Sequence, residues 1–207
     1  AGPPPGMTPV HLRAPALPVP ETPVERPAAP PSPAERLRQL RPATDSADSS
    51  LASRGWAAYA RGDIHAAGAL LTEAAREPDA RPWVHYALGF ARLAESDVAG
   101  AARAWERVRS AAPDFNPVYF DLADAYLQGA DTQASVRVLR AAQQRWPADP
   151  DVHNALGVVQ LRRGALDDAV ESFQQAVTVA PSDPAGYFNL GRARQIRYLQ
   201  SRRYNAA

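Results

Sequence analysis

The stretch "WPADPDVHNALG" runs from Trp146 to Gly157, and "APSDPAGYFNLG" runs from Ala180 to Gly191. Both contain a Pro, then Asp-Pro, then Leu-Gly at the same spacing, and the second copy begins 34 residues after the first. The same period connects small residues at positions 55, 89, 123, 157 and 191, small residues at 67, 101, 135 and 169, and large residues at 71, 105, 139 and 173. A period of this length, held through successive units, indicates a stack of structural repeats.

Each unit contains two segments with helical hydrophobic periodicity, joined by a short turn. The small residues allow the two helices of a pair to approach closely, and the large residues fill the space beside them. A Pro ends the second helix, and a second Pro, such as Pro117 or Pro150, suits the first turn of the next helix. One pair alone exposes an apolar face, which stacking buries. The sequence therefore predicts an all-α solenoid of helix–turn–helix units.

These residues resemble the tetratricopeptide repeat family, whose pattern is aromatic-x₂-Leu-Gly-x₂-Tyr, then Ala-x₃-Phe, then Pro. The fourth unit matches this pattern at Leu156, Gly157, Ala169, Phe173 and Pro181. Two units depart from it, with Arg92 and Gln160 where Tyr is usual. The resemblance implies a right-handed α-solenoid over residues 45–207, with repeats at about 48–81, 82–115, 116–149 and 150–183 and a partial fifth at 184–207.

Residues 1–44 have a different composition, because 13 of the 21 Pro residues lie within the first 42 positions. Pro fixes φ and removes a backbone donor, so this arm favours extended polyproline II. We predict an arm that is mostly without regular structure, with a short helical turn at residues 34–41. It is either a semi-rigid spacer or a docking peptide, since polyproline II binds aromatic-lined grooves at low entropic cost.

Charge and residue usage exclude several classes of protein. The net charge of +1 argues against a dedicated nucleic-acid binder. The absence of Cys excludes disulfides, thiolate metal sites and cysteine nucleophiles. The sequence contains no run of eighteen apolar residues, so we predict no membrane span in this chain. The compartment stays open, and a periplasmic or envelope-associated protein is favoured over a cytoplasmic one.

Catalysis and metal binding are not expected. His85 and His153 lie two periods apart and occupy the slot that Tyr119 fills in the third unit, so both are interpreted as packing residues. Asp recurs at the turn between helices at positions 63, 97 and 131, where a carboxylate caps the following helix. No phosphate-binding loop, nucleophile elbow or zinc-protease motif occurs. We therefore predict no catalytic residue, no cofactor and no metal site.

One surface remains as a candidate binding site. Positions one, five and eight after the aromatic slot share a face of each first helix. The family resemblance places this face on the concave side, where partners usually bind. An apolar concavity of this kind marks a binding site, although each residue has an alternative role in packing against the next repeat. The predicted partner-binding groove comprises Trp56, Tyr59, Tyr86, Phe90, Phe120, Asp124, Asn154, Phe188 and Arg192.

The chemistry of this groove indicates its ligand. Chaperone-binding members of the family clamp a peptide carboxylate with Lys and Asn, but this chain contains no Lys. We expect an extended, apolar or Pro-containing peptide, with Asn154 holding its backbone and Arg192 supplying charge. The chain's own Pro-rich arm, in cis or in trans, is one candidate. The Arg-rich stretch at residues 192–203 leaves an anionic partner as an alternative.

Two classes of function follow. The first is a non-enzymatic protein–protein interaction scaffold or adaptor, in a bacterial envelope assembly or secretion setting. The alternative is the partner-recruiting or regulatory module of a larger enzyme, such as a glycosyltransferase, of which this chain is a fragment. The fragment interpretation rests on the fifth unit, which begins with Tyr187, Leu190 and Gly191 but has no turn near Tyr198.

Overall fold

The computed structural model describes residues 31–42 and 50–204, with side chains up to residue 201. The described residues belong to the second of two compact units, residues 31–207. They contain ten α-helices and no strand. Of the predicted arm at residues 1–44, residues 1–30 and 43–44 lie outside the described part of the chain.

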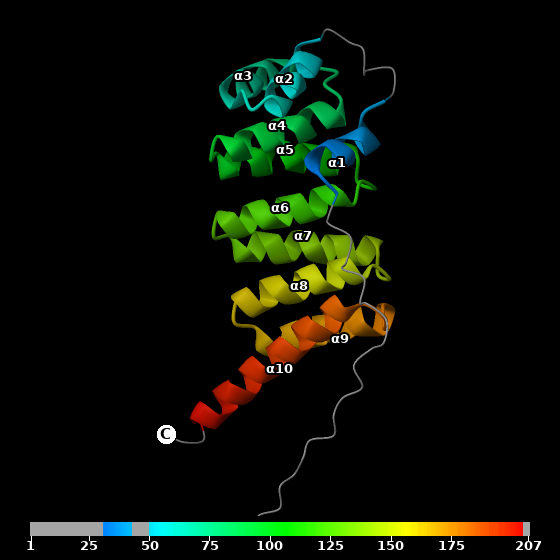
Figure 1. Ribbon diagram of the computed structural model, residues 1–207, viewed down its shortest axis with the longest axis vertical. Helices are drawn as coiled ribbons and strands as arrows, with labels where there is room; N and C mark the ends of the chain where they lie inside the picture. The colour runs from blue at the N-terminus through cyan, green and yellow to red at the C-terminus, as the bar shows by residue number, and fades with distance from the viewer. Residues whose placement is uncertain (1–30, 43–49, 205–207) are drawn as a thin grey trace, which may run out of the picture. The chain divides into compact units, whose positions relative to one another are not determined.

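Eight of these helices form four helix–turn–helix pairs, stacked as successive layers (Figure 1). The pairs are α2 (Leu51–Ala60) with α3 (Ile64–Ala74), α4 (Pro82–Ala94) with α5 (Val98–Ala111), α6 (Pro117–Gln128) with α7 (Thr132–Arg145), and α8 (Pro150–Arg162) with α9 (Leu166–Val179). Beyond them, α10 (Pro184–Tyr204) packs on α8 and α9. The predicted all-α solenoid of helix pairs is confirmed.

A further helix, α1 (Pro33–Leu40), precedes the stack and contacts α4. It lies where the sequence predicts a short helical turn. Ser32 and Glu35 form a reciprocal cap, in which the Ser32 backbone N–H donates to the Glu35 carboxylate at 2.7 Å and the Glu35 N–H donates to Ser32 Oγ at 3.3 Å. The Ser32 hydroxyl also donates to the Glu35 carboxylate at 2.7 Å, and this hydrogen bond, followed by the one from the Ser32 N–H, lowers the pKa of Glu35. Pro33, at the first helical position, has no N–H to leave unpaired.

An Asp side chain fixes the start of the second helix in the first three pairs. Asp63, Asp97 and Asp131 cap α3, α5 and α7, and each carboxylate accepts a hydrogen bond from the backbone N–H three residues later, at 3.2, 2.7 and 2.8 Å. The predicted capping role of these residues is confirmed. The residue directly before each capping Asp adopts a positive φ, which is +82° at Gly62, +64° at Ser96 and +61° at Ala130. Two of these three residues therefore carry a side chain in a conformation that favours glycine.

Close approach explains the period in small residues. A Cβ added at Gly89 would lie 2.1 Å from Nε1 of Trp105, and one added at Gly157 would lie 2.6 Å from the Phe173 ring. The large residue of the repeat thus packs directly on the backbone of the small one, as the sequence predicts. Gly55 is packed in the same way against Leu71, at 2.8 Å, whereas a Cβ at Gly191 on α10 would have no atom of the described residues within 4 Å. The same sequence position is therefore tightly packed in three units and open in the last.

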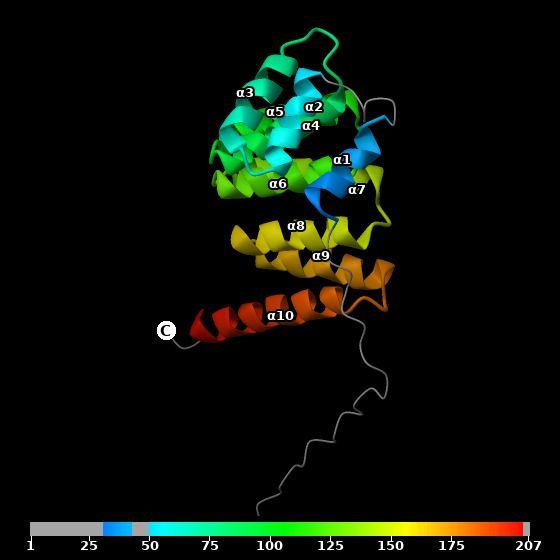
Figure 2. The ribbon, with the colours of Figure 1, turned by 45° about the horizontal axis from the view of Figure 1, so that its top comes forward.

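The last helix departs from the repeat. α10 continues without a turn past Tyr198, which agrees with the missing turn signal, and it extends beyond the end of the stack in both ribbon views (Figure 2). Tyr187, Phe188, Tyr198 and Leu199 are the exposed large hydrophobic residues of the described chain, and all four lie on α10. They are between 51% and 70% exposed. This helix therefore exposes large apolar side chains, whereas the other described helices bury or half-bury theirs.

Candidate peptide-binding site

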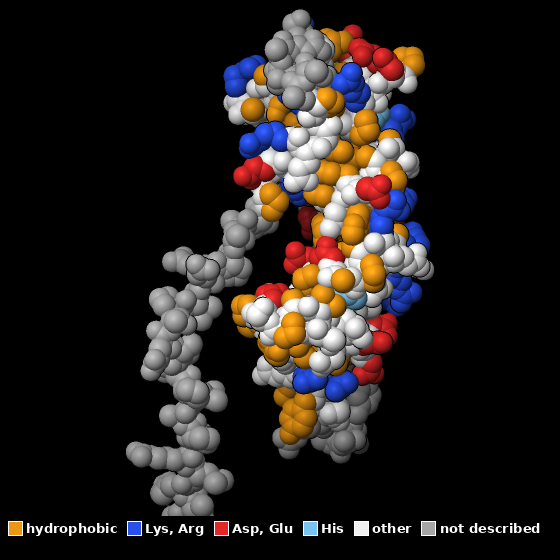
Figure 3. Space-filling view, turned by 90° about the vertical axis from the view of Figure 1, so that its right-hand side faces the viewer, with side chains coloured by type: hydrophobic (Ala, Val, Ile, Leu, Met, Phe, Trp, Pro, Cys, Tyr) orange, Lys and Arg blue, Asp and Glu red, His pale blue; other side chains and the backbone are white. Residues whose placement is uncertain are grey.

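The first helices of neighbouring pairs contact one another, α2 with α4, α6 with α8, and α8 with α10. Together these helices carry the predicted groove residues. We call the surface that they form the inner face. The space-filling view in Figure 3 shows hydrophobic side chains in a band along the stack and several arginine side chains along one flank.

Four predicted groove residues form one aromatic cluster on α2 and α4. Trp56 stacks on Tyr59 with ring centroids 5.0 Å apart, and Tyr59 lies 6.4 Å from Phe90. Tyr86 meets Phe90 edge-on at 5.0 Å. Tyr86 and Phe90 are buried, whereas Trp56 and Tyr59 are half-buried. Edge-on and stacked rings at such distances stabilise a cluster beyond the apolar area they bury.

The helix α1 lies on this cluster. Leu37 is 1% exposed and belongs to the same hydrophobic core as Tyr86 and Phe90. Full burial of a Leu side chain contributes about 1.5–3 kcal/mol. The segment that precedes the repeats is thus packed onto the inner face through an apolar contact.

Charge reinforces this contact. The Arg36 guanidinium donates to Oδ1 of Asp121 on α6 and also lies over the Phe90 ring, 5.4 Å from its centroid. The Tyr86 hydroxyl donates to the other carboxylate oxygen, Oδ2. Burial raises the pKa of Asp121, and the hydrogen bond from Tyr86 and the charge of Arg36 oppose that rise. Burial, and then the neighbouring Asp121, also raises the pKa of Tyr86. The Asp121 carboxylate is therefore shared between α1 and α4.

A second arginine extends the contact to α2. Arg41 directly follows α1, and its guanidinium lies 4.6 Å from the Trp83 ring centroid. Its Nη2 donates to Oγ of Ser53 on α2 at 2.7 Å. Cation–π contacts of this kind contribute about 0.5–1 kcal/mol at exposed sites and more when desolvated. The segment 36–41 thus contacts three successive first helices, α2, α4 and α6.

The remaining predicted residues lie farther along the inner face. Phe120 is half-buried between two core clusters. The exposed Asp124 accepts a hydrogen bond from Gln128 at 2.7 Å, and Asn154 accepts one from Asn189 at 3.3 Å. Phe188 and Arg192 are exposed on α10. The structure therefore brings the first four residues together under α1 and leaves the others spread over α6, α8 and α10.

Sequence reasoning missed the residues that hold α1. Asp121 directly follows Phe120, a predicted groove residue, and the equivalent positions of the neighbouring units are Ala87 and Ala155. A carboxylate at a position that is Ala in the neighbouring units was the available sequence signal for this contact. Arg36 and Leu37 carried no periodic signal, because α1 belongs to no repeat.

The Arg-rich end is partly engaged within the fold. Arg194 donates to Gln174 at 2.8 Å, and Arg197 pairs with Asp167 at 3.2 Å. Both partners lie on α9, so these side chains attach α10 to its neighbour. Within the described ranges, no group of three His, Asp or Glu residues is arranged to hold a metal ion. None of the described helices is both long and apolar enough to cross a bilayer.

Comparison with known proteins identifies the repeat. A tetratricopeptide repeat family model matches residues 86–150 and 120–186. The structure of MamA 41-end from Desulfovibrio magneticus RS-1 is 22% identical, with 71% of this chain and 83% of that chain covered and a TM-score of 0.59. A second crystal structure of MamA is 18% identical, with 72% and 81% covered and a TM-score of 0.61. No curated protein sequence matches the chain.

A third similar structure belongs to a different assembly. In the crystal structure of the APC/C hetero-tetramer Cut9–Hcn1, the matching chain is 18% identical, with 67% of this chain and 28% of that chain covered and a TM-score of 0.53. At these identities the likeness shows the fold alone.

Proposed function

Because this chain belongs to the tetratricopeptide repeat family through residues 86–186, we propose that its inner face binds a protein partner as an extended, apolar or Pro-containing peptide segment. The fold is that of a protein–protein interaction scaffold, a class that is typically non-catalytic. The observation that carries the proposal is the seating of α1 on the inner face. A segment from outside the repeats is held there by a buried Leu37 and by the Arg36–Asp121 ion pair.

The part of the inner face that α1 leaves free is the proposed partner site. Segment 36–41 contacts α2, α4 and α6, whereas Asn154, Phe188 and Arg192 lie on α8 and α10. Phe188 is 70% exposed and offers an apolar anchor. An extended peptide needs donors and acceptors for its backbone, which the Asn154 amide supplies, while Arg192 attracts an acidic group. These three residues match the chemistry of the proposed ligand.

The chain's own Pro-rich segment is one occupant of this site that we propose. Residues 1–30 are joined to α1 through Pro31 and Ser32, so their effective concentration near the inner face is high. Polyproline segments dock on aromatic surfaces at low entropic cost. Deleting residues 1–30 keeps α1 and tests this occupant. Faster hydrogen exchange in α8 and α10 after the deletion supports it, and unchanged exchange rejects it.

We also propose a bacterial envelope assembly or secretion setting. Its support is compositional, since a Pro- and Ala-rich segment of this kind often connects an anchor or signal to a folded domain. Cell fractionation of the tagged protein tests the setting. Recovery with envelope or periplasmic markers supports it, and recovery with cytoplasmic markers alone rejects it.

Partner binding is tested with a photo-cross-linking amino acid at Asp124, an exposed position on the inner face of α6. The matched control places the same group at Gln144, an exposed position on α7, a second helix. We expect one discrete adduct from position 124 and none from position 144. Equal capture at both positions would show that the inner face has no preference for a partner.

A further inference from the structure

A second site of different chemistry lies between the first two helix pairs, at the junction of α3, α4 and α5. A cleft of about 690 Å³ opens there, lined by residues of these three helices and the loop that follows α3. This volume is in the range of small-molecule binding sites, about 300–1,000 Å³. None of the residues that line the cleft belongs to the predicted groove. The cleft is therefore distinct from the inner face.

The repeat provides an internal comparison for this cleft. The equivalent cleft at the next junction has a volume of about 220 Å³. It is lined by Glu106, Arg109, Tyr126, Ala134, Arg137 and Val138. Each of these residues lies 34 positions after a residue that lines the larger cleft. The two clefts thus occupy equivalent positions in successive repeats and differ in the side chains that line them.

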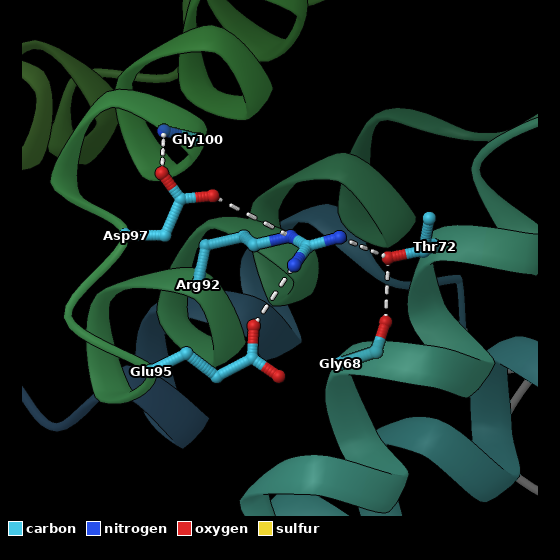
Figure 4. A network of polar contacts seen from close by, with 6 residues as sticks. All are labelled: Gly68, Thr72, Arg92, Glu95, Asp97 and Gly100. Carbon is cyan, nitrogen blue, oxygen red and sulfur yellow. Dashed lines mark hydrogen bonds and ion pairs between the residues drawn. The ribbon is translucent and has the colours of Figure 1, made fainter.

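The substitution of Tyr by Arg92 distinguishes the two junctions. At the later junction, the Tyr126 hydroxyl donates to Glu106 at 3.0 Å. At the earlier one, Arg92 donates to Glu95 at 2.9 Å and to Thr72 at 2.7 Å, and its Nε lies 4.0 Å from Asp97 (Figure 4). The guanidinium lies between these three side chains in the close-up view. Arg92 is therefore neutralised and forms a fixed part of the cleft.

Three other arginines line the cleft without partners. Arg76, Arg103 and Arg107 are exposed, and within the described residues none of their side chains forms an ion pair or a hydrogen bond. At the next junction the positions equivalent to Arg76 and Arg107 are Ser110 and Ala141. The concentration of positive charge is thus specific to the larger cleft.

The acidic residues of the cleft do not balance these arginines. Of the described residues that line it, only Glu77 and Asp97 carry carboxylates, against four arginines. One Asp97 oxygen already accepts from the Gly100 N–H at 2.7 Å, and the other faces Arg92. A positive excess with no internal partner attracts an anion, and the planar arginine fork suits oxyanions.

His85 adds a neutral polar group to the same cleft. It is 8% exposed, and in the described structure its ring forms no hydrogen bond. In the later units, Tyr119 donates to the Pro113 carbonyl at 2.9 Å, and His153 Nε2 lies 2.8 Å from the Pro147 carbonyl. The loop before His85 has its proline one residue earlier, at Pro78. In the described structure no carbonyl of that loop accepts a hydrogen bond from His85, in contrast to the Pro113 and Pro147 carbonyls of the later units. The imidazole is therefore available to a ligand.

We propose that this cleft binds the phosphate group of a small molecule, through the Arg103 and Arg107 guanidinium groups at its rim and the His85 imidazole at its base. Burial, and then the charge of Arg107, lowers the pKa of His85, so the empty cleft holds a neutral ring. A bound dianion offsets the charge of Arg107 and allows the ring to take up a proton. The phosphate comes either as free inorganic phosphate or as a phosphate monoester, and the cleft volume leaves room for the organic part of a monoester.

The test uses calorimetric titration of the full chain at constant ionic strength with inorganic phosphate and, separately, with O-phosphoserine. Arg103→Gln and Arg107→Gln are compared with Arg137→Gln, which alters the residue equivalent to Arg103 in the next unit. All three side chains are exposed, so the substitutions leave the core intact. We expect at least a tenfold loss of affinity in the first two variants and none in the third. Tighter binding of O-phosphoserine identifies a monoester site, and tighter binding of inorganic phosphate identifies a free-phosphate site.

A second measurement follows the His85 imidazole by NMR, with His85→Gln used to assign its resonance. Phosphate is expected to raise the pKa of this ring in the wild-type chain and not in Arg107→Gln. Equal affinity in all three arginine variants, or no saturable binding of either phosphate, would overturn the proposal.

Discussion

Arg36 and Asp121 form an ion pair that joins α1 to α6 across 85 positions of the chain. Their side chains are only 21% and 11% exposed. Tyr86 donates to the same carboxylate, so the pair sits within a polar network surrounded by aromatic rings. Removing one member of a buried pair leaves the other charge without compensation. This relationship decides how firmly α1 stays on the inner face.

Arg36→Ala is expected to release α1. The loss of a buried ionic partner costs about 3–5 kcal/mol, but release of α1 lets water reach Asp121 and caps the loss at the docking free energy of the helix. Hydrogen exchange in residues 33–40 is therefore expected to accelerate at least tenfold, with a smaller effect on global unfolding. Arg38→Ala is the control, because Arg38 is exposed and, among the described residues, its side chain hydrogen-bonds only to the Ala34 carbonyl of its own helix. Equal exchange rates in the two variants would contradict the docking role of Arg36.

Gly89→Ala is expected to destabilise the fold by about 1–3 kcal/mol, because the added Cβ overlaps the Trp105 ring. Gly191→Ala, at the equivalent position of α10, is expected to stabilise by about 0.5–1 kcal/mol, because the site is open and Ala favours a helix. Urea denaturation measures both free energies of unfolding. Changes of the same sign would show that the two positions are not packed as described.

Ala130→Gly is expected to stabilise the fold by about 0.5–1 kcal/mol, because Ala130 has a φ of +61°, where a Cβ is strained. The same change at Ala69, an exposed residue inside α3, is expected to destabilise by about 1 kcal/mol. Thermal unfolding of the two variants provides the comparison. A lower melting temperature for Ala130→Gly would contradict the turn geometry.

His85 is expected to make stability depend on pH. Its folded pKa lies below the ordinary value of 6.5, chiefly because of burial, so the unfolded chain binds the proton first as the pH falls. Stability should therefore decrease as the pH drops below 6.5 toward the folded pKa. To check this, the free energy of unfolding is measured for the wild-type chain and for His85→Gln between pH 7.5 and 5.5, at steps of about half a pH unit. The free energy of unfolding of His85→Gln should depend less steeply on pH than that of the wild-type chain. An identical pH dependence in the two proteins would refute the role of His85.

Most of the helical stack could be predicted from sequence because its signals are local and periodic. Pro at the first helical position, Asp at the cap and Gly opposite a large residue each act within one unit, and the 34-residue period repeats them. The Gly89–Trp105 contact follows from that spacing alone. The starts of α3, α5, α6, α7 and α8 and the missing turn in α10 followed from the same signals.

The docking of α1 could not be predicted in this way. It depends on Arg36, Leu37 and Asp121, which are far apart in sequence and outside the periodic pattern. The shared-face pattern of the first helices therefore placed Tyr86 and Phe90 in the predicted groove, although α1 and the core bury both. Burial by a non-repeating segment is a tertiary effect, and its one trace in the sequence is the carboxylate of Asp121 at a position that is Ala in the neighbouring units.

The binding role of the inner face is tested most directly by the dissociation constant of the partner captured at position 124. The constant is measured for Phe188→Ala and Leu199→Ala, which truncate two exposed apolar residues of the same helix. Loss of an interface anchor costs more than about 1.4 kcal/mol, which is tenfold in affinity. We predict at least a tenfold weaker complex for Phe188→Ala and no change for Leu199→Ala. Unchanged affinity in both variants would contradict partner binding at this part of the inner face.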